Sequence, residues 1–355
     1  MEKYFLNQNS VKEKKSTKII KAYKFIFYLN LIITIISLSL ILKFYCYIKS
    51  LKTFLTLFKE IKNEEDVKLY IKNKTEFYYK YRLKFLKKIN IKYNESNLIT
   101  FQDKLNYLLI HENPELKADI VDKIKLHQYS KKILGKDICV PILKVYENVD
   151  EINNDELPEK FVLKANHGSG MNIICKDKLK FDINKAKNKL KKWKNTNYGL
   201  LTTEFQYFTV NRKIFVAPYL GDKVIEFQIF CFNKEPKFIR AHKHLFENNH
   251  TVLHNYYNND WKLTDIESGL KHYYRIPEIK IKKPKNFNLM IDYCKKLSDK
   301  FSFVRIDFYE INNKLYLNEM TFTPSNALMK FKNKSQSRYL GSLLDISKIK
   351  SNKNM

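Results

Sequence analysis

The chain has 355 residues, 44% of them hydrophobic and 14% aromatic, which is enough for a sizeable core in one to three domains. Its formal net charge of +29 suggests nucleic acid as a partner, but only six of the 66 basic residues are arginine and the lysines are spread along the chain. Planar, bidentate phosphate contacts favour arginine, so the composition argues against a nucleic-acid partner. The five cysteines are far apart and contain no CxxC pair, so neither a disulfide framework nor a zinc site is indicated.

The N-terminal part contains one long uncharged segment. Residues 25–42 carry no charge over eighteen positions, and aromatic residues continue as far as residue 48. This length favours a transmembrane helix at residues 25–48 over a cleaved signal peptide, whose apolar region is shorter. A lysine-rich tail at residues 1–24 precedes the segment. After it, residues 49–96 are rich in lysine, tyrosine and leucine at helical spacing, which predicts a helical stalk or linker.

A folded domain is expected at residues 97–346, followed by a basic tail at residues 347–355. Its first predicted helices cover residues 101–112 and 118–134, and the second ends at Gly135, as a helix C-terminus often does. Another helix is expected at residues 181–194. Short apolar segments predict strands at residues 139–146, 161–164, 172–176, 214–220, 224–232 and 237–242.

Two of the seven glycines, Gly168 and Gly170, flank Ser169 directly after a predicted strand. Phosphate-binding loops of the P-loop and Rossmann types run from a strand through glycines into a helix. Here the residues after the glycines read as a strand instead. This order predicts a flap that folds over a phosphate chain with its backbone N–H groups, while Lys164 supplies a positive charge. An ordinary tight hairpin is the alternative.

Residues 303–324 read as two apolar strands joined by an asparagine-rich turn, with Asp307 and Glu319 inside the apolar runs. If three residues connect the strands, Asp307 pairs with Glu319 on one face of the sheet; a two-residue turn places them on opposite faces. Two adjacent carboxylates repel unless a cation lies between them. Magnesium held jointly with nucleotide phosphates is one such cation, and nearby lysines are the alternative.

Histidines gather in one region of the sequence. Residues 240–260 contain His242, His244, His250 and His254, and a His-x-His pair can hold a metal through neutral imidazoles. Because no matched cysteines or carboxylates accompany them, the pattern does not favour a zinc site.

Several segments taken in chain order carry a resemblance to a known family. The sequences TFQDKLNYLL, VDKIK, FVLKANHGSGMNI, NYGL, CFNKEPKFI, FVRIDFYE and NEMTFTP resemble the TupA-like family of the ATP-grasp superfamily. The resemblance covers residues 98–345 and omits the predicted anchor and stalk. It implies an α+β fold in which two α+β subdomains with antiparallel sheets clasp ATP, here preceded by the predicted N-terminal transmembrane helix.

The resemblance implies roles for the residues of the glycine loop and the hairpin. Lys164 contacts the phosphates of ATP, Asp307 and Glu319 hold Mg2+, and Arg305 stabilises developing negative charge. Glu226 is the nearest acidic residue for the ribose. The flap that closes over the nucleotide consists of His167, Gly168, Ser169 and Gly170.

Four positions depart from the pattern of the superfamily. Thr321 stands where an asparagine usually follows the metal-binding glutamate, and Ser325 stands where a glycine is expected. The hinge strand, which often carries acidic residues near the adenine, has Ala217 and Pro218. These departures bear on metal affinity and on the oxyanion site, and a weakened or inactive site is the alternative.

The activity implied by the resemblance is ATP-dependent carboxylate–amine ligation. A carboxylate donor is activated as an acylphosphate and joined to a polysaccharide or envelope-precursor acceptor. Two alternatives remain open: glycosyl or phosphoryl transfer on the same fold, and a non-enzymatic module that binds polyanions or membranes. Because ATP is cytoplasmic, we expect a single-pass membrane protein with a cytoplasmic catalytic domain, although the flanking lysines lean weakly the other way.

Overall fold

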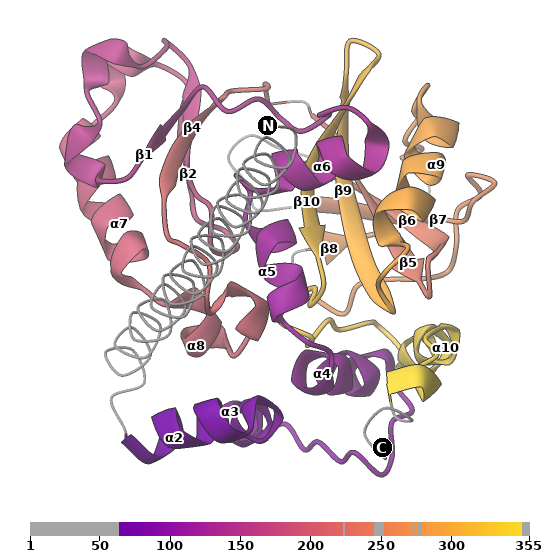
Figure 1. Cartoon of the computed structure of the whole chain (residues 1–355). Helices are drawn as coiled ribbons and strands as arrows, with labels where there is room; N and C mark the ends of the chain where they lie inside the picture. Colours follow the sequence, from indigo (N-terminus) through magenta and orange to yellow (C-terminus); the bar gives the residue numbers. More distant parts are fainter. Residues whose placement is uncertain (1–63, 223, 245–251, 271–272, 276–278, 350–355) are drawn as a thin grey trace, which may run out of the picture. The chain divides into compact units, whose positions relative to one another are not determined.

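The computed structural model describes residues 64–349, except residues 223, 245–251, 271–272 and 276–278 (Figure 1). The chain divides into two units, residues 1–73 and residues 74–355. In the first unit the described element is helix α2 (Glu64–Lys72). The predicted tail at residues 1–24 and the predicted transmembrane helix at residues 25–48 lie outside the described residues.

The predicted membrane location needs correction. Among the residues that the structure describes, no helix is long and apolar enough to cross a membrane. The longest of them, α3 (Lys74–Lys88), has 15 residues and carries several lysines. At 1.5 Å per residue, this helix is about 22 Å long, shorter than the roughly 30 Å hydrocarbon core of a bilayer. The expectation of a single-pass membrane protein with a cytoplasmic domain is contradicted by this finding, and membrane attachment is not part of the function proposed below.

Helix α3 belongs to the folded unit, although its residues were expected to form part of a stalk. Phe77 is fully buried and its ring lies 6.2 Å from that of Phe205. Arg82 is also fully buried, and its guanidinium donates hydrogen bonds of 2.7–2.8 Å to the side chains of Asn106, Thr203 and Asn326. A buried arginine is tolerated only with such partners, so α3 is fixed by polar as well as apolar contacts.

Two short helices replace the single helix predicted at residues 118–134. They are α5 (Glu115–Val121) and α6 (Leu126–Leu134), and α6 ends at Gly135 with φ 73°. The interruption follows from Asp122, whose carboxylate accepts a hydrogen bond of 2.9 Å from the backbone N–H of Ile124 and so competes with the helix. The preceding helix, α4 (Phe101–His111), starts at a capping box between Thr100 and Asp103.

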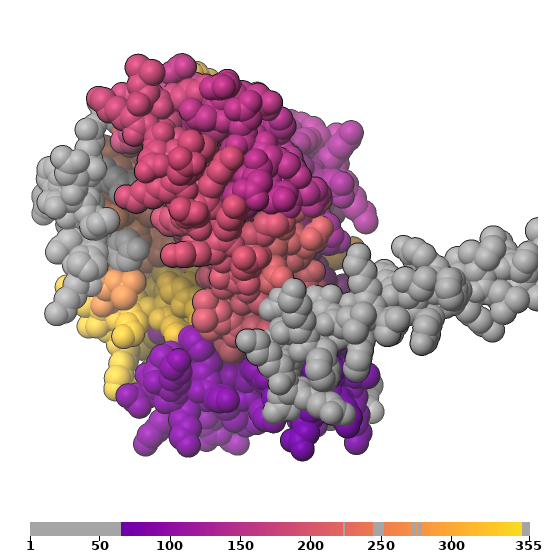
Figure 2. Space-filling model, turned by 90° about the vertical axis from the view of Figure 1, so that its left-hand side faces the viewer, coloured from indigo at the N-terminus to yellow at the C-terminus, as the bar shows by residue number. Residues whose placement is uncertain are grey.

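The smaller sheet has four antiparallel strands in the order β1-β4-β2-β3. They are β1 (Lys144–Tyr146), β2 (Phe161–Ala165), β3 (Asn172–Cys175) and β4 (Ile214–Pro218). Helix α7 (Ile183–Asn195) buries Ala186 and Leu190 in the same core as Phe161 and Leu163 of β2. Figure 2 shows this side of the molecule, where the surface over the small sheet consists of segments coloured magenta to pink. Helix α8 (Tyr198–Thr202) follows α7.

The larger sheet has six strands in the order β10-β9-β5-β6-β7-β8, antiparallel except for the last pair. One face is apolar and packs on helix α9 (Phe287–Ser298). Because side chains alternate along a strand, the opposite face carries a different set of residues, in which polar side chains such as Asp307 and Gln228 lie beside phenylalanines such as Phe230. Helix α10 (Lys334–Leu343) follows the sheet in the chain. The strands are β5 (Glu226–Phe232), β6 (Glu235–His244), β7 (Val252–Tyr257), β8 (Tyr273–Tyr274), β9 (Phe303–Ile311) and β10 (Lys314–Thr321).

The β9–β10 hairpin pairs Asp307 with Glu319, but not through the connection that was expected. The turn has two residues, Asn312 (φ 51°) and Asn313 (φ 63°), which is the left-handed backbone of a type I′ turn. By itself this turn would put the two carboxylates on opposite faces. An extra residue, Asn318, forms a bulge between Leu317 and Glu319 and shifts the register by one. The predicted pairing is therefore correct, whereas the predicted three-residue connection is wrong.

Candidate active site

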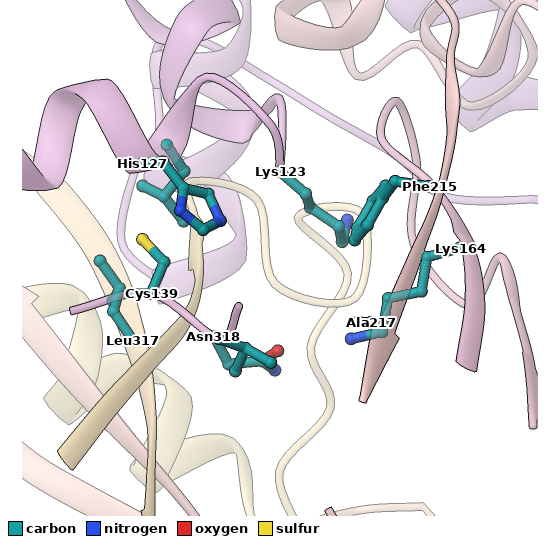
Figure 3. Close-up of a pocket in the computed structure, with 10 residues that line it drawn as sticks. Lys123, His127, Cys139, Lys164, Phe215, Ala217, Leu317 and Asn318 are labelled. Atoms are coloured by element: carbon teal, nitrogen blue, oxygen red, sulfur yellow. The ribbon is translucent and has the colours of Figure 1, made fainter. Parts of the chain in front are cut away.

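The candidate site lies where the polar face of the large sheet meets β2 and β4 of the small sheet. Figure 3 shows a pocket there, with Lys164 from β2 and Asn318 from β10 extending toward each other and Lys123 entering from the α5–α6 connection. Apolar side chains form much of the remaining wall, including Phe215 of β4 and Leu317 of β10. The pocket therefore combines an apolar lining with lysines, as a nucleotide site requires. Its other lining residues are Leu126, His127, Cys139, Val140 and Ala217.

Arg305 joins the two paired carboxylates. Its Nε and Nη2 atoms donate to the two oxygens of Asp307 at 2.7 and 2.6 Å, and Nη2 also donates to Glu319 at 3.0 Å. Thr321, which replaces the expected asparagine, accepts from Arg305 at 3.2 Å and donates to Glu319 at 3.0 Å. The departure at this position thus leaves a polar group that orients Glu319.

Burial changes the acidity of this group. Burial raises the pKa of Asp307, which is 0% exposed, and the guanidinium of Arg305 offsets part of that increase. Burial acts in the same direction on Glu319, but Lys123 and Arg305 outweigh it and hold its pKa below the ordinary value. Glu319 is therefore held ionised, and its Oε2 atom lies 3.8 Å from the amino group of Lys123.

A second polar layer lies beside these carboxylates on β5. Gln228, the cross-strand neighbour of Asp307, donates to it at 3.2 Å and to Glu226 at 2.7 Å. Asn318, placed on the site face by the bulge, donates to Glu226 at 2.8 Å. Burial, followed by the charge of Glu319, raises the pKa of Glu226. Glu226 thus sits within the carboxylate cluster.

The positive side of the site consists of two lysines. Lys164 lies on β2, and burial together with the charge of Lys123 lowers its pKa. The amino group of Lys123 donates to the backbone oxygen of Gly168 at 2.7 Å, which links it to the glycine loop. A lysine that is buried and faces another cation is poised to bind an anion.

The glycine loop connects β2 and β3, so the predicted strand, loop, strand order is present. Its base is fixed by Asn166, whose Nδ2 donates to Asp122 and to the backbone oxygen of Asn211, both at 2.9 Å. His167, 1% exposed, bonds through Nε2 to the backbone oxygen of Trp193 at 3.0 Å. Burial lowers the pKa of His167 to about 4, so the ring is neutral and its role in this structure is to anchor the loop.

The tip of the loop has different properties from its base. Ser169 and Gly170 are exposed, and Gly170 has φ 70°, a conformation that favours glycine. A Cβ atom at Gly168 would lie 2.9 Å from the ring of Tyr198. The two positions therefore require glycine for different reasons: Gly170 has a left-handed backbone, and Gly168 approaches Tyr198 too closely for a side chain. The tip offers backbone N–H groups without side chains that would obstruct a phosphate.

The described histidines of the 240–260 region do not form a metal site. His242 on β6 and His254 on β7 are cross-strand partners with ring centroids 4.7 Å apart. Among the described residues, the one group with three ligand atoms within 4.8 Å of one another is His127, Asp137 and Cys139. His127 already bonds to Asp137 at 2.7 Å, and burial raises the pKa of the Cys139 thiol, which disfavours a thiolate ligand.

Sequence reasoning found Lys164, Arg305 and the paired carboxylates, but it missed the three residues described next. Lys123 lies in the VDKIK segment quoted above, yet only the fold brings it beside Glu319. Gln228 and Asn318 reach the site through strand order and a bulge, for which the sequence offers no local signal. Ser325, another of the four departures, has φ 53°, a left-handed conformation that favours glycine.

A glycine flap between strands, a lysine beside it and paired carboxylates on an antiparallel hairpin are together typical of the ATP-grasp fold. Residues 103–345 match the family described as TupA-like ATPgrasp, and the chain belongs to this family. The predicted α+β ATP-grasp fold with antiparallel sheets is thereby confirmed. Known enzymes of this fold are ATP-dependent carboxylate–amine ligases that use ATP and typically Mg2+.

Solved structures with a similar fold include ligases. The D-alanine–D-alanine ligase from Bacillus anthracis complexed with ATP is 14% identical, with a TM-score of 0.41 over 74% of this chain and 79% of that one. D-alanyl-alanine synthetase A from Vibrio cholerae is 13% identical, with a TM-score of 0.43 over 70% of each chain. The ATP-grasp ligase PsnB complexed with a minimal precursor is 8% identical, with a TM-score of 0.34 over 62% of this chain.

The chain spans 60% of the length of PsnB. With TM-scores below 0.5, these similarities carry no argument about substrates or about individual residues. No curated protein matches the chain.

Proposed function

We propose that the chain activates a substrate carboxylate with ATP and joins it to an amine or similar nucleophile in the synthesis of a cell-surface polysaccharide or envelope precursor. The observation that carries this proposal is the facing arrangement of Lys164 and Lys123 with the carboxylates of Asp307 and Glu319. Phosphoryl transfer requires mainly positioning and charge neutralisation, and this site provides both signs of charge. The family resemblance supports the envelope role.

Asp307 and Glu319 fit a Mg2+ ion by their chemistry. Both offer hard oxygen ligands, and they are cross-strand partners on one face of the sheet. Oε2 of Glu319 accepts no hydrogen bond from the described residues and lies 3.8 Å from the amino group of Lys123. When bound, Mg2+ neutralises phosphate charge. Thr321 and Arg305 orient Glu319, and Gln228 orients Asp307.

The residues of the pocket divide the remaining work. The apolar wall formed by Phe215, Ala217 and Leu317 suits the base of the nucleotide, and Lys164 suits its phosphates. The exposed tip of the glycine loop, residues 169–170, closes over the phosphate chain with backbone N–H groups. A carboxylate oxygen of the donor then attacks the terminal phosphorus, ADP leaves, and the nucleophile displaces phosphate from the acylphosphate.

Calorimetry of ATP binding to the full chain, with and without magnesium, tests this proposal. We expect the wild type to bind ATP only with magnesium. Removing a group that merely orients a metal ligand lowers affinity roughly 10–100-fold, so we expect Asp307→Asn to lower the affinity for ATP by more than this. The matched control is Asp299→Asn, which alters an exposed carboxylate paired with Lys234 and should bind like the wild type. A folded wild-type chain that binds no ATP in the presence of magnesium contradicts the proposal.

A further inference from the structure

Arg240 is a buried arginine that has no role in the reaction proposed above. It lies on β6, is 9% exposed, and donates from Nε to the side-chain oxygen of Gln228 at 2.5 Å. Its guanidinium also lies over the ring of Phe230, 5.7 Å from the centroid. Among the described residues, neither terminal nitrogen has a hydrogen-bond partner, and no carboxylate lies within ion-pair distance. Glu226 attracts Arg240 electrostatically but forms no ion pair with it, so the terminal nitrogens keep hydrogen-bonding capacity that an anionic ligand would satisfy.

The other arginine on this face of the sheet differs in this respect. Arg305 donates to both oxygens of Asp307 and to Glu319, so two carboxylates neutralise it within the protein. A substrate carboxylate would therefore have to compete with two fixed carboxylates for Arg305. Among the described residues, no carboxylate forms a hydrogen bond with the two terminal nitrogens of Arg240.

The register of the sheet places Arg240 close to the reacting centre. Asp307, Gln228 and Arg240 are successive cross-strand partners on β9, β5 and β6, so their side chains share one face. Two strand spacings amount to about 10 Å, which the side chains shorten. Gln228 bridges the gap, because it donates to Asp307 and accepts from Arg240. Arg240 is not among the residues that line the pocket suited to the nucleotide.

We propose that Arg240 binds the carboxylate of the donor substrate through its two terminal nitrogens and that Gln228 positions it. The proposal rests on the ligase function proposed above. A planar guanidinium fork matches a carboxylate in a way that a lysine cannot. One carboxylate oxygen forms a bond to the terminal phosphorus of ATP while the bond from that phosphorus to the ADP oxygen breaks. Arg240 takes no proton in this step and serves to hold and orient the carboxylate.

The test uses formate as a minimal carboxylate and the full chain labelled with 15N-arginine. The chain has six arginines, and the signals of Arg240 are those absent from Arg240→Lys. We expect these signals to shift saturably with sodium formate and not with sodium chloride at equal ionic strength. Arg338, exposed on α10, provides the internal control and should respond equally to both salts. Signals of Arg240 that stay unmoved, or that follow those of Arg338, overturn the proposal.

Two variants separate binding from positioning. Gln228→Leu keeps the guanidinium but removes the acceptor of its Nε–H, so Arg240 is no longer held in position. We expect formate to bind about tenfold more weakly, which corresponds to one charge-assisted hydrogen bond. Arg338→Lys should leave the formate midpoint unchanged. If Arg240→Lys does not fold, Gln228→Leu identifies the same signals, because it removes a direct partner of Arg240. An unchanged midpoint in Gln228→Leu contradicts the positioning role.

Calorimetry with magnesium and ATP on the same samples distinguishes failure of this proposal from failure of the ligase function. If ATP binds and formate does not shift the signals of Arg240, the proposed carboxylate site is wrong and the ligase proposal is retained. If formate shifts Arg240 in a folded chain that binds no ATP, the ligase proposal falls and Arg240 stands as a carboxylate-binding residue of another activity.

Discussion

The two sheets present opposite charges to the candidate site, and they hold these charges in different ways. On the large sheet, Asp307 is fully buried and receives hydrogen bonds from Arg305 and Gln228. On the small sheet, the amino group of Lys164 makes no hydrogen bond to any described residue, and burial lowers its pKa. The acidic side is therefore arranged before any ligand arrives, whereas the cationic side is costly to maintain until an anion binds.

This difference assigns separate tasks to the two sheets. A carboxylate group held by hydrogen bonds within the protein suits the positioning of charge at the reacting centre, because little reorganisation is needed during reaction. An unpartnered lysine beside an exposed loop tip suits the capture of a mobile ligand. The glycine loop follows the same division, since its base at Asn166 and His167 is anchored and its tip is open.

Arg305→Met should lower the free energy of unfolding more than any other substitution considered, because Arg305 holds the carboxylates of the large sheet in place. The substitution leaves Asp307 buried without its main partner, and breaking a buried pair in this way costs about 3–5 kcal/mol of unfolding free energy. Urea denaturation of the full chain at pH 7 measures the loss. The matched control is Lys296→Met, which breaks an exposed pair with Asp292 on α9 and should cost less than about 1 kcal/mol. Equal losses in the two variants contradict the view that the carboxylate group is held in advance.

The sequence predicted the chemistry of the acidic side but not its construction. Asp307 and Glu319 were found because carboxylates inside apolar strands need a cation. Their pairing depends on a two-residue turn and on the bulge at Asn318, which shifts the register by one residue and so compensates for the short turn. Neither the turn length nor the bulge can be predicted from local propensity. The position of Arg240 beside Gln228 likewise depends on strand order, which is a property of the whole sheet.

The cationic side shows the same limit. Lys164 and the glycines were predicted from their local pattern, since a strand followed by glycines and another strand forms a loop whatever the remainder does. Lys123 was not predicted, because its place beside Glu319 depends on the interruption between α5 and α6 at Asp122. Arg82 was missed because a lysine-rich helix at the N-terminal side of the domain resembles a solvated linker.

The anchored base of the glycine loop should be sensitive to acid. Burial lowers the pKa of His167 from 6.5 to about 4, so the unfolded chain binds more protons between these values. The contribution is fully present above pH 6.5 and is lost as the pH falls toward 4, to an extent of about 3 kcal/mol. Unfolding free energies of the wild type and His167→Asn, measured from pH 7 to pH 4.5, should therefore converge. Parallel profiles mean that the acid sensitivity arises elsewhere.

Lys164→Met should separate nucleotide binding from stability. Removing a phosphate contact weakens binding of magnesium-ATP by about 10–100-fold, which is one or two times 1.4 kcal/mol. The free energy of unfolding should be unchanged or higher, because burial makes the charge of Lys164 unfavourable in the free protein. Lys180→Met, at an exposed lysine of the same part of the chain, is the calorimetric control. A large loss of stability in Lys164→Met contradicts the contrast between the two sheets.

The smallest effect is expected at the loop tip, in Gly170→Ala. No atom lies within 4 Å of the added Cβ, so the substitution acts only through φ 70°, where a side chain costs about 1–2 kcal/mol. If the tip is free to relax, the measured loss of unfolding free energy falls below this range while the affinity for ATP declines. Gly168→Ala differs, because its Cβ would lie 2.9 Å from the ring of Tyr198 and so disturb packing. A larger loss of unfolding free energy in Gly170→Ala than in Gly168→Ala contradicts an open tip. It would mean that the left-handed backbone at Gly170 is held as firmly as the base of the loop.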